Sequence, residues 1–148
     1  MSVDESVTTD LIQTLQDGQE GYTAAAEKLS TGDHAQWSPR LQELALQRAT
    51  FAAELTTMAA AYGDAITEDG TVAGTLHRGW MALKDALSGS DSSAVLDAAE
   101  QGEDHAVGVY RKALDQELST DLRAVVERQF TEVRAAHDEV RAMRNGVR

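Results

Sequence analysis

The stretch Ala99-Glu100-Gln101-Gly102-Glu103-Asp104-His105 lies in the middle of a long run in which apolar residues recur at helical spacing. At about 100° per residue, Glu100 and Glu103 share one helix face with four apolar positions, Leu96, Val107, Tyr110 and Leu114. Two carboxylates on the inward face of a helix are costly to bury unless something compensates their charge. We therefore expect a metal ion, a cation from a neighbouring helix, or water to face them.

The composition predicts one all-helical domain over residues 1–148. The chain has 148 residues, of which 42% are hydrophobic and 5% aromatic, with one proline and no cysteine. The formal net charge of −12 argues against nucleic acids and anionic membrane surfaces as partners. The lack of cysteine excludes disulfides and thiolate metal sites. No signal peptide or membrane-spanning run is recognisable, so we expect a soluble, cytoplasmic protein.

The apolar periodicity predicts four long helices and one short one. The long helices are expected from residue 4 or 6 to 30, and over 38–62, 92–117 and 119–144; the short helix is expected over 75–87. Ser38 is expected as an N-cap before Pro39, and Asn145-Gly146 as the end of the last helix. Inside the first helix, Gly18 suggests a close helix approach, whereas Gly21 suits a tolerated surface glycine better.

The lengths of the connections predict how these helices are arranged. Short turns join the first long helix to the second, and the third to the fourth, so each of these pairs is antiparallel. The long segment between the second and third helices is a crossover that carries the short extra helix. This pattern predicts an all-α, ferritin-like four-helix bundle.

Counting residues from the turns places polar side chains of all four long helices at one level. We expect a buried polar cluster there of Tyr22, Arg48, Glu100, Glu103 and His137, with Gln129 about one turn away. Glu20 lies at the same depth but points outward, unless a bulge at Gly18 to Gly21 rotates it inward.

Four segments carry a family resemblance: Asp17-Gly18-Gln19-Glu20-Gly21-Tyr22, Leu76-His77-Arg78-Gly79-Trp80, Gln101-Gly102-Glu103-Asp104 and His137-Asp138. They resemble a bacterial family of ferritin-like four-helix-bundle proteins that contain a domain of unknown function. The resemblance covers nearly the whole chain. It implies the bundle fold and a bacterial source, but no activity.

The sequence departs from the pattern of di-iron ferritin-like proteins, which place a Glu on each of two helices and Glu-x-x-His on the other two. Arg48 stands where the second helix would carry the Glu of that motif, and Arg134 stands three residues before His137. Arginine cannot ligate a metal, because it stays charged and has no lone pair to donate. We therefore expect no cofactor, and we expect the guanidinium of Arg48 to bond the carboxylates of both Glu100 and Glu103.

Three classes of function remain open at this stage. The first is a non-catalytic bundle with a stress-related or partner-binding role, in which the cluster is a buried ion-pair network or serves a small-molecule or partner site. The second is an iron- or manganese-binding oxidoreductase or storage protein that uses Glu100, Glu103 and His137, with or without Glu20. The third is a subunit of a homo-oligomer or other assembly, with an exposed strip of Phe51, Met58 and Tyr62.

Other residues point less clearly to a function. No nucleophile–base pair and no phosphate-binding loop is recognisable, which favours a protein that is not an enzyme. His34 and His105 are expected to be solvent-exposed, and His77 lies on the short helix. Trp80 is expected to anchor that helix on the bundle.

Overall fold

The computed structural model describes residues 2–60, 80–89 and 91–147, and all regular structure in these residues is helical. The elements are α1 (Val3–Leu29), the short 3-10 helix η1 (Ala35–Trp37), α2 (Ser38–Ala59), α3 (Met81–Ser88), α4 (Ser92–Leu114) and α5 (Thr120–Val147). The predicted all-helical class is confirmed. None of the helices in this part of the chain combines the length and the apolar character of a membrane span.

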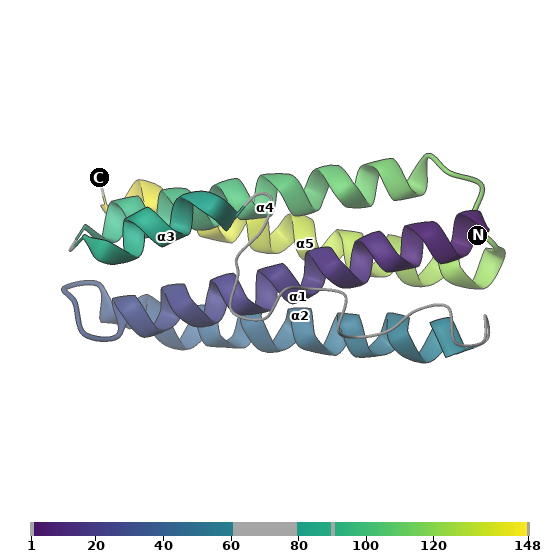
Figure 1. Ribbon diagram of the computed structural model, residues 1–148. Coiled ribbons are helices and arrows are strands. Elements are labelled where there is room, and N and C mark those ends of the chain that lie inside the picture. Colours follow the sequence, from purple (N-terminus) through teal and green to yellow (C-terminus); the bar gives the residue numbers. More distant parts are fainter. Residues whose placement is uncertain (1, 61–79, 90, 148) are drawn as a thin grey trace.

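The four long helices lie side by side (Figure 1). α1 packs most extensively against α2 and α4 against α5, while α1 and α4 join the two pairs. Each of these two pairs is antiparallel, and α2 and α4 run in the same direction (Figure 1). Residues 61–79 of the predicted crossover, including His77 and the expected start of the short helix at 75–79, lie outside the described residues, whereas the rest of that helix is present as α3.

Several helix ends differ from the predicted ones; α4, for example, ends at Leu114 and not at residue 117. Ser38 is not an N-cap; it is the first residue of α2, and its Oγ donates a hydrogen bond of 2.7 Å to the carbonyl oxygen of Ala26 on α1. α5 does not stop at Asn145 but continues to Val147. Gly146 lies against the ring of Trp37 there, so packing on η1 supports the last turn of α5.

Two apolar clusters fill the interior, one toward each end of the molecule. On α1, for example, Leu11 and Leu15 belong to one cluster and Tyr22 and Leu29 to the other. The same division occurs on the other long helices, so the residues between the clusters form one layer near mid-length. Buried polar side chains occupy that layer: Asp17, Arg48, Glu100 and Glu103.

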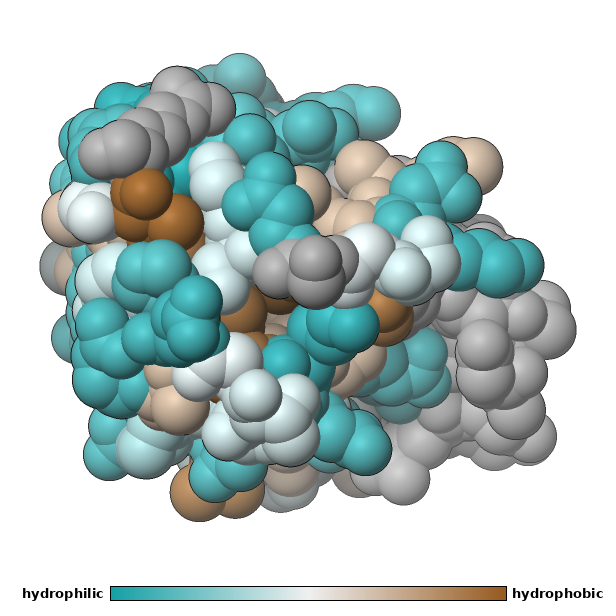
Figure 2. Space-filling model, turned by 90° about the vertical axis from the view of Figure 1, so that its left-hand side faces the viewer, coloured by the Kyte–Doolittle hydropathy of each residue, from teal (hydrophilic) through white to brown (hydrophobic). Residues whose placement is uncertain are grey.

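The described surface is mostly polar. Figure 2 views the end that lies at the left in Figure 1, where apolar side chains appear only in small, separate areas. Among the described residues, the exposed large apolar side chains are Val3, Leu46 and Met81, and they lie on three different helices. The strip expected for an assembly subunit is not present as predicted, because Phe51 is buried in the core and Met58 is partly buried against it. Tyr62 lies outside the described residues.

Candidate functional site

Arg48 of α2 and Glu103 of α4 form an ion pair at the centre of the polar layer. Their side chains are only 1% and 0% exposed. The Arg48 Nη2 donates to Glu103 Oε2 at 2.8 Å, and Nη1 donates to Oε1, so one guanidinium satisfies both carboxylate oxygens. Burial lowers the pKa of Arg48, but the Glu103 carboxylate, together with Tyr22 and Tyr110, raises that pKa above its ordinary value. The Arg48 guanidinium therefore stays charged at any physiological pH.

α1 supplies the wall on which the Arg48 side chain lies. A Cβ atom at Gly18 would lie 3.4 Å from the Arg48 Cγ, so the glycine leaves room for the arginine stem. The Tyr22 ring centroid is 5.3 Å from the Arg48 Cζ, which is a cation–π distance. The Tyr22 Oη is buried and makes no geometrically acceptable hydrogen bond within the described residues, although it lies close enough to Glu103 for that carboxylate to affect its pKa.

Trp80 packs beside Tyr22 on α1, in agreement with the expectation that it anchors the short helix on the bundle. Its ring packs edge-on against Tyr22, with 5.1 Å between the centroids, and the residue is 2% exposed. It fits between α1 and α4 because both helices have a glycine there: a Cβ at Gly21 or at Gly102 would lie within 2.6 Å of three ring atoms of Trp80. The interpretation of Gly21 as a surface glycine was therefore wrong.

Glu100 does not join Glu103 on Arg48, contrary to the expectation that Arg48 bonds both carboxylates. Its Oε2 accepts a 2.8 Å hydrogen bond from Arg141 Nε, and its Oε1 accepts from Arg144 Nη1. Three residues of helix rotate a side chain by about 60° from the starting direction, which turns Glu100 away from α2 and toward α5. The two acids thus belong to separate ion-pair groups.

Gln129 belongs to a network beside the Arg48–Glu103 pair. Its Oε1 accepts a 2.7 Å hydrogen bond from the Tyr110 hydroxyl, and its Nε2 donates to Glu54 at 2.9 Å. Arg128 donates to the other oxygen of Glu54. The Arg48 guanidinium is close enough to affect the pKa of Tyr110, so the network adjoins the central pair electrostatically.

His137 turns toward the surface and away from the central pair. Its Nε2 lies at hydrogen-bonding distance from Asp104 Oδ1, and its Nδ1 lies 3.2 Å from Asp138 Oδ1. Glu20 also stays outside the cluster, because α1 continues as a regular helix through Gly18 and Gly21 and leaves Glu20 partly exposed. The predicted cluster is thus divided between four neighbouring groups: Tyr22 with Arg48 and Glu103, and three others that contain Glu100, Gln129 and His137.

The residues expected as metal ligands are each engaged elsewhere. Arg48 holds both oxygens of Glu103, two arginines hold Glu100, and the ring of His137 faces two aspartates. Within the described ranges, no group of three or more histidine, aspartate or glutamate side chains is placed to hold a metal ion.

Sequence reasoning missed several polar residues in and around these groups. Asp17 is buried, although an ideal apolar stripe through Leu11 and Leu15 leaves it outside. A signal was available: Thr14, Asp17 and Gly21 recur every three or four residues and are all buried, which indicates a second covered face of α1. Arg141 and Arg144 were missed because they lie beside the apolar stripe of α5, from which long side chains reach inward.

The buried tyrosines predict a steep loss of stability in alkali. Burial, with the Glu103 carboxylate, raises the pKa of Tyr22 above the ordinary value of 10.0, and burial also raises that of Tyr110. Above about pH 10 the unfolded chain loses these protons while the folded chain keeps them, so stability present below that pH is lost as the pH rises. Each group contributes a slope of about 1.4 kcal/mol per pH unit.

Urea denaturation between about pH 9 and 11 measures this slope directly. Tyr22→Phe and Tyr110→Phe should each remove about half of it, since each leaves one titrating group. An alkaline slope that neither substitution reduces would contradict the assignment to these two hydroxyls.

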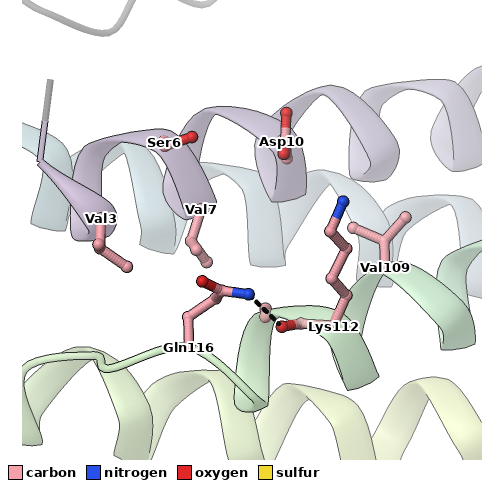
Figure 3. A pocket seen from close by; sticks show the side chains of 8 residues that line it. Val3, Ser6, Val7, Asp10, Val109, Lys112 and Gln116 are labelled. Atoms are coloured by element: carbon pink, nitrogen blue, oxygen red, sulfur yellow. Dashed lines mark hydrogen bonds between the residues drawn. The ribbon is translucent and has the colours of Figure 1, made fainter.

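A pocket of about 200 Å³ lies apart from the buried groups, between the start of α1 and the end of α4. Figure 3 shows Val3 and Val7 on one side and Lys112 and Gln116 on the other. Gln116 Nε2 donates to the carbonyl oxygen of Lys112 at 3.4 Å, which holds the amide at the rim (Figure 3). Lys112 thus lines a pocket that is separate from the Arg48–Glu103 pair.

Comparison with known protein families relates the chain to a domain family. A family model described as "Domain of unknown function (DUF2383)" matches residues 5–116. The match runs from α1 to the end of α4 and includes the residues around the central pair, Gly18, Tyr22, Arg48 and Glu103. α5, which carries Gln129 and His137, lies beyond it. No protein of curated function matches the chain.

Proposed function

Because this chain belongs to the DUF2383 family of domains of unknown function, whose description assigns no activity, we propose a function from the geometry: a non-catalytic, ferritin-like binding domain. In this proposal the Arg48–Glu103 pair takes the place that a di-metal centre has in metal-binding ferritin-like proteins. The interior then stabilises the fold, and the surface of the helices carries the binding role.

The arrangement of the helices supports the ferritin-like part of the proposal. α1 and α2 are antiparallel, α4 and α5 are antiparallel, and α2 and α4 run in the same direction (Figure 1). Ferritin-like folds differ from simple up-down bundles in this respect, since they need one long connection between the second and third long helices.

One observation carries the proposal: both oxygens of the buried Glu103 carboxylate accept hydrogen bonds from the Arg48 guanidinium. In di-iron relatives of this fold, the carboxylates at this depth bind metal. A metal at Glu103 would have to displace a buried guanidinium that has no other carboxylate partner within the described residues. Leaving such a charge buried and unpaired is strongly unfavourable.

Metal binding by the purified protein tests the proposal. Protein expressed in medium supplemented with iron and manganese should contain only substoichiometric metal by elemental analysis. Its thermal midpoint should not respond to added Fe²⁺ or Mn²⁺. A metal present at a hundred times its Kd would instead stabilise the fold by about 2.7 kcal/mol and raise the midpoint by about 5–10 °C.

A matched variant identifies the origin of any response. His137→Ala removes the histidine expected for a metal site but leaves the Arg48–Glu103 pair untouched. A stoichiometric metal whose stabilising effect disappears in His137→Ala would overturn the proposal in favour of a metalloprotein. A weak response that survives in this variant would show that surface carboxylates bind the ion.

A further inference from the structure

A second pocket, of about 340 Å³, lies between α4 and α5 on the surface. Arg111 lines it from α4, and Arg134 and Arg141 line it from α5. Gly108 lies on the α4 wall, and a Cβ added there would meet no atom within 4 Å, so the pocket is open at this point. Three guanidinium groups thus surround one opening in a chain whose formal net charge is −12.

Two of these arginines have no carboxylate partner in the described part of the chain. Arg141 is engaged with Glu100. Arg134 lies over the ring of Phe130, with 5.6 Å between Cζ and the ring centroid. This contact uses the face of the guanidinium and leaves its N–H donors for a ligand. Arg111 makes no ion pair within the described ranges. Arg111 and Arg134 therefore offer donors from two facing helices.

The acids of the pocket are directed at His137. Asp104 and Asp138 lie on opposite sides of its ring, one at each nitrogen. Both carboxylates thus lie at the edge of the imidazole ring. Arg111 and Arg134 are then the cations of the pocket for which no carboxylate partner is found within the described residues.

We propose that this pocket binds a small oxyanion, either inorganic phosphate or the phosphate group of a small phosphate monoester. Arginine donors are matched to phosphate oxygens, because the planar fork bonds two oxygens at once. The volume is at the lower end of the range for small-molecule sites and has room for more than one phosphate group. The proposal uses none of the contacts of the Arg48–Glu103 pair, so either can fail without the other.

Titration of the full chain with inorganic phosphate, followed by calorimetry and by the backbone amide signal of Gly108, tests the site. Saturable binding is expected. Arg111→Ala and Arg134→Ala should each weaken it about tenfold or more, as the loss of a hydrogen bond to a charged group requires. Both side chains are exposed, so these variants should fold normally, which circular dichroism checks.

Lys112→Ala is the matched control. Lys112 follows Arg111 in the sequence and has the same charge, but it lines the other pocket (Figure 3). It should change the phosphate Kd by less than about twofold, because salt screens charges outside the site. Asp138→Asn should tighten binding, because it removes a negative charge from the pocket.

Repeating the titration with phosphoserine and with glycerol phosphate distinguishes the two sources of the oxyanion. A monoester that binds more tightly than inorganic phosphate assigns the site to an organic phosphate; equal affinities assign it to the free ion. The absence of saturable binding by any of the three probes would overturn the proposal. An equal loss of affinity in Lys112→Ala and Arg111→Ala would do the same, because it would indicate attraction by overall charge.

Discussion

Replacing Arg48 by leucine is expected to destabilise the protein by about 3–5 kcal/mol, which is a large part of the stability of a domain of this size. The substitution leaves the Glu103 carboxylate with no exposure to solvent and without the cation that holds both of its oxygens. It also removes the guanidinium from the face of Tyr22. Urea denaturation at neutral pH measures the loss as a lower midpoint with an unchanged slope.

The double variant Arg48→Leu/Glu103→Leu separates two quantities: the cost of burying an unpaired charge, and the contribution of the ion pair to the free energy of unfolding. Because it leaves no charge behind and fills the layer with apolar groups, it should be clearly more stable than Arg48→Leu alone. Arg40→Leu is the matched control: Arg40 lies on the same helix and pairs with Glu139, but its side chain is 44% exposed. Its loss should cost no more than about 1 kcal/mol. Equal midpoints for the single and double variants at position 48 would contradict this account.

The central pair was predictable because two independent patterns indicate it. Arg48 and Glu103 each interrupt an apolar stripe, and the lengths of the turns place both residues at the same depth. Two charges that helical periodicity turns inward at one level have to compensate each other. Tyr22 follows from the same reasoning, since it lies on the inward face of α1 at that level.

The bonding partners of Glu100 could not be predicted in the same way. Periodicity gives a direction to within a few tens of degrees, and Glu100 is rotated by only about 60° from Glu103. The position of α5 decides which cation each carboxylate meets. The arginines that bond Glu100 extend from partly exposed positions of α5, and a sequence pattern cannot show how far such side chains reach.

Gly21 and Gly102 show a second reason why the sequence alone does not predict the packing. Helical spacing identifies them as internal glycines but does not show what lies above them. Their common neighbour, Trp80, comes from a separate segment of the chain. The contact of both glycines with Trp80 can be recognised only when α1 and α4 are known to lie side by side.

Gly102→Ala is expected to cost about 3 kcal/mol or more, because the new methyl group overlaps the indole of Trp80 and the ring has to leave its place between α1 and α4. Gly108→Ala is the matched control on the same helix. A Cβ at Gly108 meets nothing, so this substitution should stabilise the protein by about 0.5–1 kcal/mol through helix propensity. Denaturation of the two variants side by side measures the difference.

Fluorescence shows whether the indole moves. The chain has two tryptophans, so a Trp37→Phe background leaves Trp80 as the only one. Buried at 2% exposure, Trp80 should emit at short wavelength, and Gly102→Ala should shift its emission toward that of a solvated indole. An unshifted spectrum together with unchanged stability would contradict the close packing at Gly102.

A double-mutant cycle then assigns the cost of Gly102→Ala to its contact with Trp80. In a Trp80→Leu background the ring atoms that the new methyl group would overlap are gone, so Gly102→Ala should become neutral or stabilising there. The two substitutions should therefore couple by about 3 kcal/mol, the upper part of the range for residues in contact. Gly108→Ala should show no coupling to Trp80→Leu, because nothing lies above it. A cost of Gly102→Ala that persists without the indole would place the constraint in the α1–α4 backbones and not in the tryptophan between them.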